Sequence, residues 1–424
     1  MNYFRFINSV SLRRKATPLR GFSALLAKAS PSLIFLASGV PNPKLFPFKD
    51  AKITLKDGMQ LDITENKMND ALQYGPTPGY PNLIKSLKEF QKKYHNPPNF
   101  EQFDVLVTTG GQDGLCKIFE MMLNPGDYVI IQEPAYPGTL GILNPYKPNY
   151  LVLEGDANGI NPDSLRKVLN KWSPEDARNV NSGVPKMIYL NPNGANPAGT
   201  SISSDRRKEI YKIAQEYDLL IIEDDPYYFL QFSKAAPSFL SLDTDGRVIR
   251  LDSFSKILSA GMRVGYVTGP KPLLERVNFH MQVSTLHTSS LSQVLISELL
   301  NEWGPIGFDN HIKNVQTFYK NQKDLMIGFA NKWLTGLAEW DEPVAGMFLW
   351  IKVRGIDDTH SMIMEKALEK NVALVPGRFF LTDDTKPSSY LRASFSMADS
   401  EKMDKGFQRL AALIREELNC KKSA

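Results

Sequence analysis

From about residue 100 the chain alternates short apolar runs of β type with patterns typical of helices. The predicted strands lie at residues 105–109, 128–131, 187–190, 219–222 and 247–251. Strands that alternate with helices are typical of a parallel sheet covered by helices, because parallel strands need long crossover connections. We therefore expect an α/β fold whose large domain holds a mainly parallel sheet flanked by helices.

The C-terminal part of the chain has a different pattern. A helical region around residues 305–335 is followed by short apolar runs at 346–351 and 390–395. We interpret this part as a smaller α+β domain that the N-terminal segment joins. The expected organisation has three parts. These are an N-terminal arm with part of the small domain at 1–50, a large domain at 51–325 and a C-terminal small domain at 326–424.

Composition excludes several classes of protein. Of the 424 residues 42% are hydrophobic and 23% are charged, which is ordinary for a globular chain and excludes a disordered one. Two cysteines are too few for a disulfide framework, and the five histidines show no metal-ligand spacing. No run of 18 apolar residues occurs. We therefore expect no metal site and no membrane span.

Charge is distributed unevenly along the chain. Residues 1–49 hold eight basic side chains and no acidic one, whereas the rest holds 42 basic and 46 acidic residues. The mildly acidic body makes a nucleic-acid partner unexpected. An acid-free N-terminus with Arg and Ser is typical of a mitochondrial transit peptide, although a basic surface arm or an arm that binds an anionic substrate fits equally. The expected location is the mitochondrial matrix or the cytoplasm.

Glycines, hydroxyls and basic side chains that suit an anion follow two of the predicted strands. Gly111 and Gln112 open the helix after residues 105–109, where backbone N–H groups and the helix dipole favour phosphate. Two hydroxyls, a lysine and an arginine follow residues 247–251, and together they suggest a phosphate clamp. These four residues are Ser253, Ser255, Lys256 and Arg263. Each of them alone could be an ordinary turn residue or a solvated side chain.

Three further polar residues follow strands. Asp224 comes directly after an apolar run, where a carboxylate is costly unless a cation pairs with it. It could cap a helix, form a salt bridge or act as counter-ion to a ligand nitrogen. Tyr227 could be a core residue or a ligand contact, and Asn196 could be a turn residue or a ligand contact. Ligands bind at the carboxyl ends of strands in open α/β sheets, so we expect the site there.

The order of these motifs resembles that of a known family. Asn196-Pro-Ala-Gly, then Asp224-x-x-Tyr227, then Ser-Phe-Ser-Lys256 with Arg263 behind it, is similar to the class I/II aminotransferases of fold type I. These enzymes use pyridoxal 5′-phosphate (PLP). Segments 39–43, 222–232, 282–287 and 332–340 resemble the kynurenine/α-aminoadipate aminotransferase branch. The resemblance covers nearly the whole chain and implies a seven-stranded, mainly parallel sheet.

The resemblance implies roles around the cofactor ring. Lys256 would form the internal Schiff base with PLP and then move the proton of the substrate. Asp224 would pair with the pyridinium nitrogen. Asn196 and Tyr227 would hydrogen-bond the phenolic oxygen of PLP, and Tyr136 would stack on the ring.

The resemblance also assigns the phosphate contacts. Those within the chain would come from Gly111, Gln112, Ser253, Ser255 and Arg263. Some close relatives have serine where this chain has Gly111, so only the backbone contributes at that position. Tyr74 resembles a tyrosine that reaches the phosphate of the neighbouring subunit, which implies a homodimer with shared active sites.

Substrate contacts follow from the same resemblance. Arg392 would bind the α-carboxylate, since a guanidinium binds a carboxylate in bidentate fashion. Gly39 would close over the substrate, and Asn196 would also lie beside it. Arg20 is a candidate partner for a second, distal carboxylate, although it could equally be a surface charge.

The implied activity is amino-group transfer to 2-oxoglutarate by a ping-pong mechanism. The amino donors would be L-2-aminoadipate, L-kynurenine and aromatic or other bulky L-amino acids, in lysine or tryptophan breakdown. A PLP-dependent cysteine-S-conjugate β-lyase is the alternative, because it uses the same lysine, aspartate and arginine. A PLP-binding transcription regulator is not expected, since aminotransferase-like sequence begins within about the first 40 residues and leaves no room for a winged helix.

Overall fold

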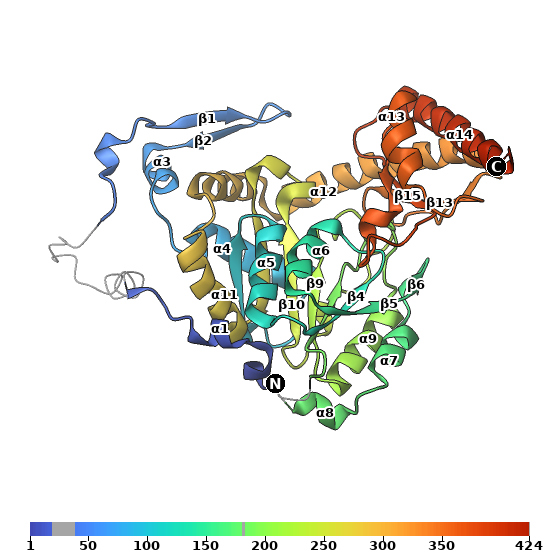
Figure 1. Cartoon of the computed structure of the whole chain (residues 1–424). Helices are drawn as coiled ribbons and strands as arrows, with labels where there is room; N and C mark the ends of the chain where they lie inside the picture. Colours follow the sequence, from blue (N-terminus) through green and yellow to red (C-terminus); the bar gives the residue numbers. More distant parts are fainter. Residues whose placement is uncertain (19–38, 180–182, 424) are drawn as a thin grey trace, which may run out of the picture. The chain divides into compact units, whose positions relative to one another are not determined.

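The computed structural model describes residues 1–18, 39–179 and 183–423 (Figure 1). The chain divides into two compact units. Unit 1 comprises Met1–Asn124 with Ser238–Asn310, and unit 2 comprises Pro125–Pro237 with His311–Ala424. The domain boundaries expected near residues 50 and 325 stay a prediction.

Unit 1 holds a three-stranded part of the main sheet and the helices that cover it. Its strands are β1 (Ala51–Thr54), β2 (Gln60–Ile63), β3 (Phe103–Thr108), β10 (Val248–Ser253) and β11 (Gly265–Pro270). Its α-helices are α1 (Ser9–Arg13), α3 (Glu65–Leu72), α4 (Pro81–Tyr94), α5 (Gly111–Met122), α10 (Phe239–Leu242), α11 (Lys271–Ser284) and the start of α12 (Ser290–Leu334). Its 3₁₀ turns are η1 (Tyr3–Phe6), η2 (Pro43–Leu45), η3 (Phe100–Gln102), η5 (Phe254–Lys256) and η6 (Ala260–Met262).

Strand β11 lies between β3 and β10 and is antiparallel to both. Every residue of β11 is buried, and α5 packs against both β10 and β11 while α4 and α11 pack against β3. Helix α4 presents Leu83 and Leu87, four residues apart, to this core, and both are fully buried. The unit is therefore a helix-covered sheet in which strand β10 leads directly into the 3₁₀ turn η5.

The N-terminal segment through α1 packs into unit 1. Phe6 is fully buried. The backbone N–H of Asn8 donates to the carbonyl of Met121 at 2.9 Å, and its side-chain amide donates to the carbonyls of Glu120 and Leu123 at 2.8 and 2.9 Å. These carbonyls lie at the C-terminal end of α5, where helix carbonyls have no partner within the helix. Asn8 therefore caps the C-terminal end of α5, and residues 1–13 pack as part of unit 1.

Unit 2 holds four parallel strands of the main sheet and a separate C-terminal sheet. Its strands are β4 (Tyr128–Gln132), β5 (Asn149–Leu153), β6 (Gly155–Asp156), β7 (Gly159–Ile160), β8 (Met187–Leu190), β9 (Leu220–Asp224), β12 (Ala338–Glu339), β13 (Phe348–Val353), β14 (Val375–Pro376) and β15 (Tyr390–Ser394). Its helices and turns are α6 (Pro137–Leu143), η4 (Asn144–Tyr146), α7 (Pro162–Leu169), α8 (Pro174–Arg178), α9 (Ser204–Glu216), η7 (Met362–Lys366), α13 (Ala367–Glu369), η8 (Gly377–Phe380), α14 (Ser400–Ser423) and the rest of α12.

Two of the parallel strands of unit 2, β8 and β9, are buried along their whole length. Strand β8 pairs with β4 on one side and β9 on the other, and all residues of β8 and β9 are buried. Continuous apolar runs of this kind are typical of strands covered on both faces. The predicted strands at 187–190 and 219–222 are confirmed. Asp224 is the last residue of β9, so its carboxylate lies at the carboxyl end of a buried strand.

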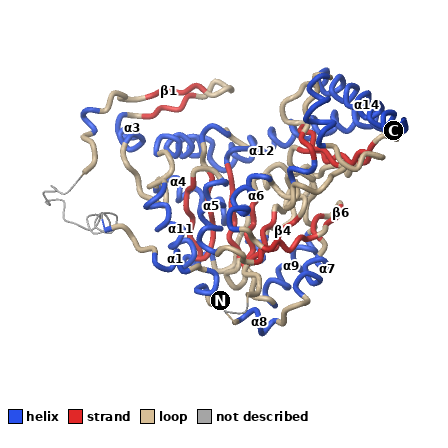
Figure 2. The backbone as a smooth tube through the Cα atoms, in the orientation of Figure 1, coloured by secondary structure: helices blue, strands red, loops and turns tan. Residues whose placement is uncertain are grey.

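The seven strands of the main sheet follow the order β3-β11-β10-β9-β8-β4-β5, and Figure 2 shows them in red between blue helices. The three pairings among β9, β8, β4 and β5 are parallel, whereas the two pairings of β11 are antiparallel. The predicted fold class, a mainly parallel seven-stranded sheet flanked by helices with a smaller α+β part, is confirmed.

The C-terminal part of unit 2 forms a four-stranded sheet of order β12-β13-β15-β14, and its described pairings are antiparallel. Helix α12 leads into it and is interrupted at Gly304, whose φ of 56° and ψ of −174° lie outside the helical region and precede Pro305. The predicted helical region at 305–335 is confirmed as the part of α12 beyond this break.

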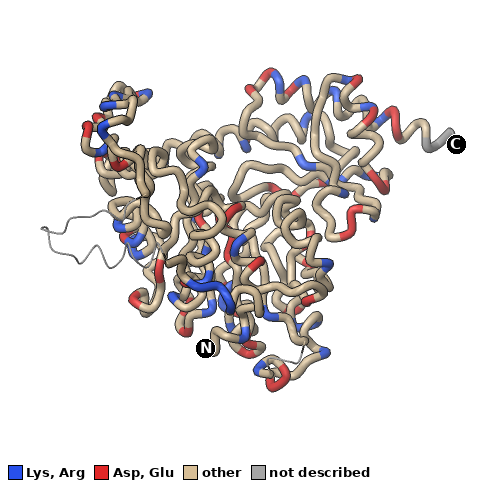
Figure 3. The backbone as a smooth tube through the Cα atoms, turned by 60° about the vertical axis from the view of Figure 1, so that its left-hand side comes forward, with Lys and Arg blue, Asp and Glu red and all other residues tan. Residues whose placement is uncertain are grey.

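Surface charge and hydropathy add two observations. Figure 3 shows basic and acidic residues interspersed along the body of the chain. No helix among the described residues is both long and apolar enough to cross a bilayer.

Candidate active site

The N-terminus of α5 and the loop after β10 form a cradle of N–H and hydroxyl groups in unit 1, and the chemistry of these groups suits an anion. Helix α5 begins at Gly111, directly after Gly110, whose φ is +77°. A Cβ at Gly110 would collide with the guanidinium of Arg263, and one at Gly265 would lie 2.8 Å from the backbone nitrogen of Gly111. Glycines therefore allow the arginine and the helix terminus to approach each other closely.

Arg263 is positioned by hydrogen bonds within unit 1. Its Nη1 donates to Ser255 Oγ at 3.3 Å and to the carbonyl of Ala260 at 3.2 Å. The backbone N–H of Ser255 in turn donates to Ser253 Oγ at 3.1 Å. Arg263 has a φ of 53°, a left-handed conformation, and its side chain is exposed to solvent. The structure thus brings together four predicted residues, namely Gly111, Arg263, Ser255 and Ser253, around one small region.

The other predicted residues of unit 1 lie in defined places. Lys256 ends η5 and is half-buried, and Gln112 is exposed in the first turn of α5. Tyr74 is 58% exposed, and its ring lies edge-on to His287 with centroids 6.2 Å apart. Gly39 is exposed. Arg20 lies outside the described residues.

A buried polar cluster surrounds Asp224 in unit 2. Asp224 is 8% exposed, and Tyr189 donates its phenolic hydrogen to Asp224 Oδ2 at 2.6 Å. Asn191 donates its amide to the backbone carbonyl of Asp224 at 2.6 Å and accepts from the backbone N–H of Asn196 at 2.8 Å. Asn191 therefore ties the end of β9 to the predicted Asn196 loop.

Tyr227 and Tyr136 also lie in unit 2. Tyr227 is 4% exposed, and burial together with the charge of Asp224 raises the pKa of its phenol well above the usual range. The phenol therefore keeps its proton and remains a hydrogen-bond donor. Tyr136 is half-buried and precedes α6.

Arg392, in β15, reaches the loop that contains Asn196. Its Nη1 donates to Asn196 Oδ1 at 2.8 Å. Its guanidinium carbon lies 4.3 Å from the ring centroid of Phe348 and 5.1 Å from that of Phe380. Burial lowers the pKa of Arg392, and its buried Nε has no hydrogen-bond partner. An unpaired buried donor on a cation is costly, so this side suits an anionic ligand.

A cavity of about 370 Å³ in unit 2 is lined by both Arg392 and Tyr136. Leu140, Phe379 and Phe380 form apolar parts of its wall. The loop before Tyr136 is held to this wall because the backbone N–H of Ala135 donates to the carbonyl of Phe380 at 2.8 Å. A ligand with a carboxylate and an apolar body fits such a cavity.

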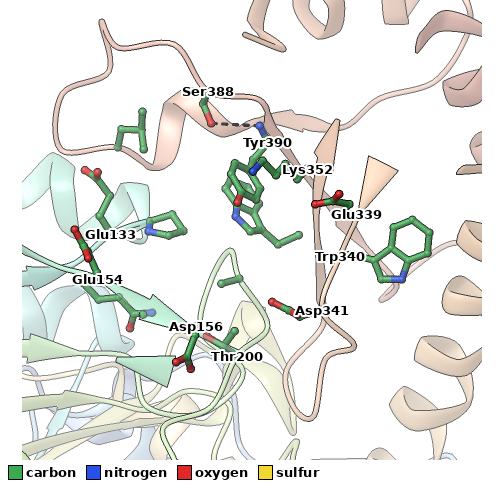
Figure 4. A pocket seen from close by; sticks show the side chains of 16 residues that line it. Glu133, Glu154, Asp156, Thr200, Glu339, Trp340, Asp341, Lys352, Ser388 and Tyr390 are labelled. Atoms are coloured by element: carbon green, nitrogen blue, oxygen red, sulfur yellow. Dashed lines mark hydrogen bonds between the residues drawn. The ribbon is translucent and has the colours of Figure 1, made fainter. Parts of the chain in front are cut away.

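A second cavity of unit 2, about 490 Å³, has a different lining (Figure 4). Carboxylates and aromatic rings surround it, with Lys352 as a basic side chain among them. The labelled carboxylates are Glu133, Glu154, Asp156, Glu339 and Asp341. None of the residues predicted for the active site lines this cavity. Among the described residues there is also no group of three or more His, Cys, Asp or Glu side chains placed to hold a metal ion.

Several contacts of these predicted residues were not foreseen from the sequence. Tyr189 and Asn191 hold Asp224, and Thr139 in turn donates to Tyr189. The rings of Phe348 and Phe380 lie near the Arg392 guanidinium. Tyr189 lies inside an apolar strand, where its phenol gives no signal distinct from core packing. The motif Asn191-Pro-Asn-Gly was visible, but which amide faces Asp224 depends on the fold.

The sequence and the fold both match known aminotransferases. The family model described as aminotransferase class I and II matches residues 33–410. The bovine kynurenine/alpha-aminoadipate aminotransferase, mitochondrial, is 51% identical over 425 residues, which cover 99% of this chain and 100% of that protein. Candida albicans aminotransferase Aro8 superposes with a TM-score of 0.88 at 27% identity, with 99% of each chain covered.

A third match includes the cofactor in its amino form. Kynurenine aminotransferase from Pyrococcus horikoshii, solved in complex with PMP, is 31% identical with a TM-score of 0.77 and 98% of each chain covered. The present chain belongs to the class I and II aminotransferase family. It is an aminotransferase, and its cofactor is pyridoxal 5′-phosphate.

The residues of each unit fit parts of this cofactor. In unit 1, the N–H groups at the start of α5, the Arg263 guanidinium and the Ser255 hydroxyl have the chemistry of a phosphate site. In unit 2, the buried Asp224 carboxylate suits a protonated ring nitrogen. The chain thus carries donors for the phosphate and an acceptor for the ring.

Proposed function

We propose that this enzyme transfers the amino group of L-2-aminoadipate, L-kynurenine or aromatic and other bulky L-amino acids to 2-oxoglutarate. The observation that carries the proposal is Arg392, a guanidinium docked on Asn196 with a buried Nε that has no partner. The chain is 51% identical to a kynurenine/alpha-aminoadipate aminotransferase over its full length, which supports the substrate class. The enzyme would then act in lysine or tryptophan breakdown.

In this proposal the chain holds PLP through two sets of residues. The phosphate contacts are Gly111, Gln112, Ser253, Ser255 and Arg263. Asp224 would pair with the ring nitrogen, Asn196 and Tyr227 would hydrogen-bond the phenolic oxygen, and Tyr136 would lie against the ring. Support comes from the hydrogen bond of Arg263 to Ser255 and from the burial of Asp224 and Tyr227. PLP supplies an electron sink for the electron pair left when the substrate α-carbon loses its proton.

The remaining steps belong to side chains. Arg392 binds the α-carboxylate and orients the substrate, because a guanidinium donates two parallel hydrogen bonds that hold a carboxylate in one orientation. Lys256 Nζ would form the covalent link to the cofactor and, once released, would move the proton of the α-carbon. Gly39 closes over the substrate and Arg20 binds a distal carboxylate, as the family resemblance suggests.

We further propose a homodimer in which Tyr74 contacts the phosphate held by the neighbouring subunit. The 58% exposure of Tyr74 in the single chain supports a role outside its own unit. The relatives are named mitochondrial, which supports the same location for this enzyme.

The β-lyase alternative is not favoured, because the relatives that match across the full chain are aminotransferases. The test is a product analysis of the PLP-loaded enzyme with 2-oxoglutarate and each amino donor. We expect glutamate to form with L-2-aminoadipate and L-kynurenine, with parallel double-reciprocal lines. Ammonia and pyruvate released from a cysteine S-conjugate at a higher kcat/KM, or no glutamate with any of these donors, would contradict the proposal.

A further inference from the structure

Tyr189 lies beside Asp224 because of strand register. Strands β8 and β9 are parallel, and Tyr189 is paired with Ile222. Side chains alternate between the two faces of a strand, so Asp224, two residues after Ile222, lies on the same face as Tyr189. The structure joins the two side chains by a hydrogen bond of 2.6 Å from the phenol to Asp224 Oδ2.

A third residue holds the phenol in place. Thr139, in α6, donates its hydroxyl to the Tyr189 oxygen at 3.0 Å. Thr139 is fully buried, and Tyr189 is 2% exposed. The donor chain from Thr139 through Tyr189 to Asp224 therefore runs through the interior, where hydrogen bonds to a charge are strong.

The chemistry of Asp224 makes this donor important. Burial disfavours the charged form of a carboxylate, and a hydrogen bond donated to it favours that form. Burial and the charge of Asp224 raise the pKa of Tyr189 well above its usual value, so the phenol keeps its proton and can only donate to the carboxylate. Asn191 binds the backbone carbonyl of Asp224, so backbone and carboxylate have separate anchors.

We propose that Tyr189, held by Thr139, is a positioning residue that keeps Asp224 ionised and oriented, so that the proton it shares with the cofactor stays on the ring nitrogen. This inference rests on the proposed pairing of Asp224 with that nitrogen. Without the phenol, the buried carboxylate has a higher proton affinity and draws the shared proton from the ring. The cofactor ring then withdraws electrons from the substrate α-carbon less strongly, while the substrate-binding residues are unchanged.

The direct test is ¹⁵N NMR of the holoenzyme loaded with PLP labelled at the ring nitrogen, since the chemical shift reports whether the nitrogen is protonated. In Tyr189→Phe we expect the signal to move toward the unprotonated position. Thr139→Val, which keeps the phenol but removes its anchor, should give a smaller shift in the same direction. Tyr150→Phe is the matched control, because Tyr150 also donates to a side chain, Asn144 Oδ1, at 2.7 Å.

Kinetics provide the second readout. We expect Tyr189→Phe to lower kcat about tenfold, the effect of losing one hydrogen bond to a charged group, with substrate KM within about twofold of wild type. A signal in Tyr189→Phe equal to that of Tyr150→Phe would overturn the inference, even if kcat falls. If Tyr189→Phe does not fold, a Thr139→Val signal identical to wild type would overturn it.

One further variant separates this inference from the proposed function. Asp224→Asn removes the carboxylate charge and should move the ring-nitrogen signal more than Tyr189→Phe does. If Asp224→Asn leaves the signal at the wild-type position, the proposed role of Asp224 is wrong. If Asp224→Asn moves the signal and Tyr189→Phe does not, the role of Asp224 stands and only the inference about Tyr189 is wrong.

Discussion

Arg392 is docked on Asn196 through a 2.8 Å hydrogen bond from Nη1 to the amide oxygen. The guanidinium also lies within cation–π distance of the Phe348 and Phe380 rings. A binding group that is already ordered loses little conformational entropy when its ligand arrives. Asn196 is thus both a predicted contact of the cofactor and the hydrogen-bond partner that orients Arg392, the proposed carboxylate-binding residue.

Arg392→Lys should lower kcat/KM by about a hundredfold or more for both the amino donor and 2-oxoglutarate, because an ammonium cannot reproduce bidentate binding and loses ~3 kcal/mol. Steady-state kinetics with both substrates measure the effect. Arg354→Lys, at a solvent-exposed pair with Glu339, is the matched control and should change little. Equal kcat/KM values for the Arg392 and Arg354 variants would contradict the carboxylate role.

The phosphate role of Arg263 predicts a loss of cofactor affinity. Arg263→Met removes a charged donor that lies beside Ser255, so the apoenzyme should bind PLP about ten- to a hundredfold more weakly, a loss of ~1.5–3 kcal/mol. Equilibrium titration of the apoenzyme with PLP gives the dissociation constant. An unchanged dissociation constant would show that the cradle at the start of α5 does not hold the phosphate.

The cap that Asn8 forms on the C-terminal end of α5 predicts an effect on stability. Asn8→Ala removes two side-chain hydrogen bonds to the carbonyls of Glu120 and Leu123 and should lower the free energy of unfolding by about 1–3 kcal/mol. Urea unfolding measures this change in the free energy of unfolding. Val10→Ala, at a half-exposed position on the same short helix, should cost much less. Equal losses in the two variants would mean that Asn8 does not cap α5.

Buried His95 predicts loss of stability in acid. Burial and the charge of Arg250 hold the pKa of His95 well below its usual value of about 6.5. The unfolded chain therefore binds a proton that the folded chain does not, so stability falls as pH drops through about 6.5. Urea unfolding at pH 7.5 and 5.5 should show a smaller pH-dependent loss in His95→Asn than in wild type. The same loss in both proteins would contradict this origin.

Much of the fold was predictable because it rests on local patterns. The apolar runs that became β8 and β9 are buried along their whole length, so their hydrophobicity was a direct signal. Strand β11 was not predicted. Its sequence, Gly265-Tyr-Val-Thr-Gly-Pro270, contains glycine and proline, and its structure depends on antiparallel pairing with β3 and β10. Such long-range pairing leaves little trace in the local sequence.

The candidate site was predictable at the level of motifs and not at the level of contacts. Asp224 and Asn196 follow strands and could be named from their positions. The donor chain from Thr139 to Tyr189 connects α6 with β8 across 50 residues, and only the packed fold brings the two hydroxyls together. Arg20 lies outside the described residues, so its contact with a distal carboxylate stays a prediction.

The most direct measurement is the absorption spectrum of the purified PLP-loaded enzyme before and after addition of L-2-aminoadipate, for wild type, Lys256→Ala and the surface control Lys271→Ala. Wild type and the Lys271 variant should show the visible band of lysine-linked PLP, and the amino acid should convert it to the shorter-wavelength band of the amino form. Lys256→Ala should lack both the lysine-linked band and catalytic turnover. A wild-type protein that binds no PLP, or a Lys256→Ala variant that converts the band as wild type does, would contradict the assignment of this chain as a PLP-dependent aminotransferase that acts through Lys256.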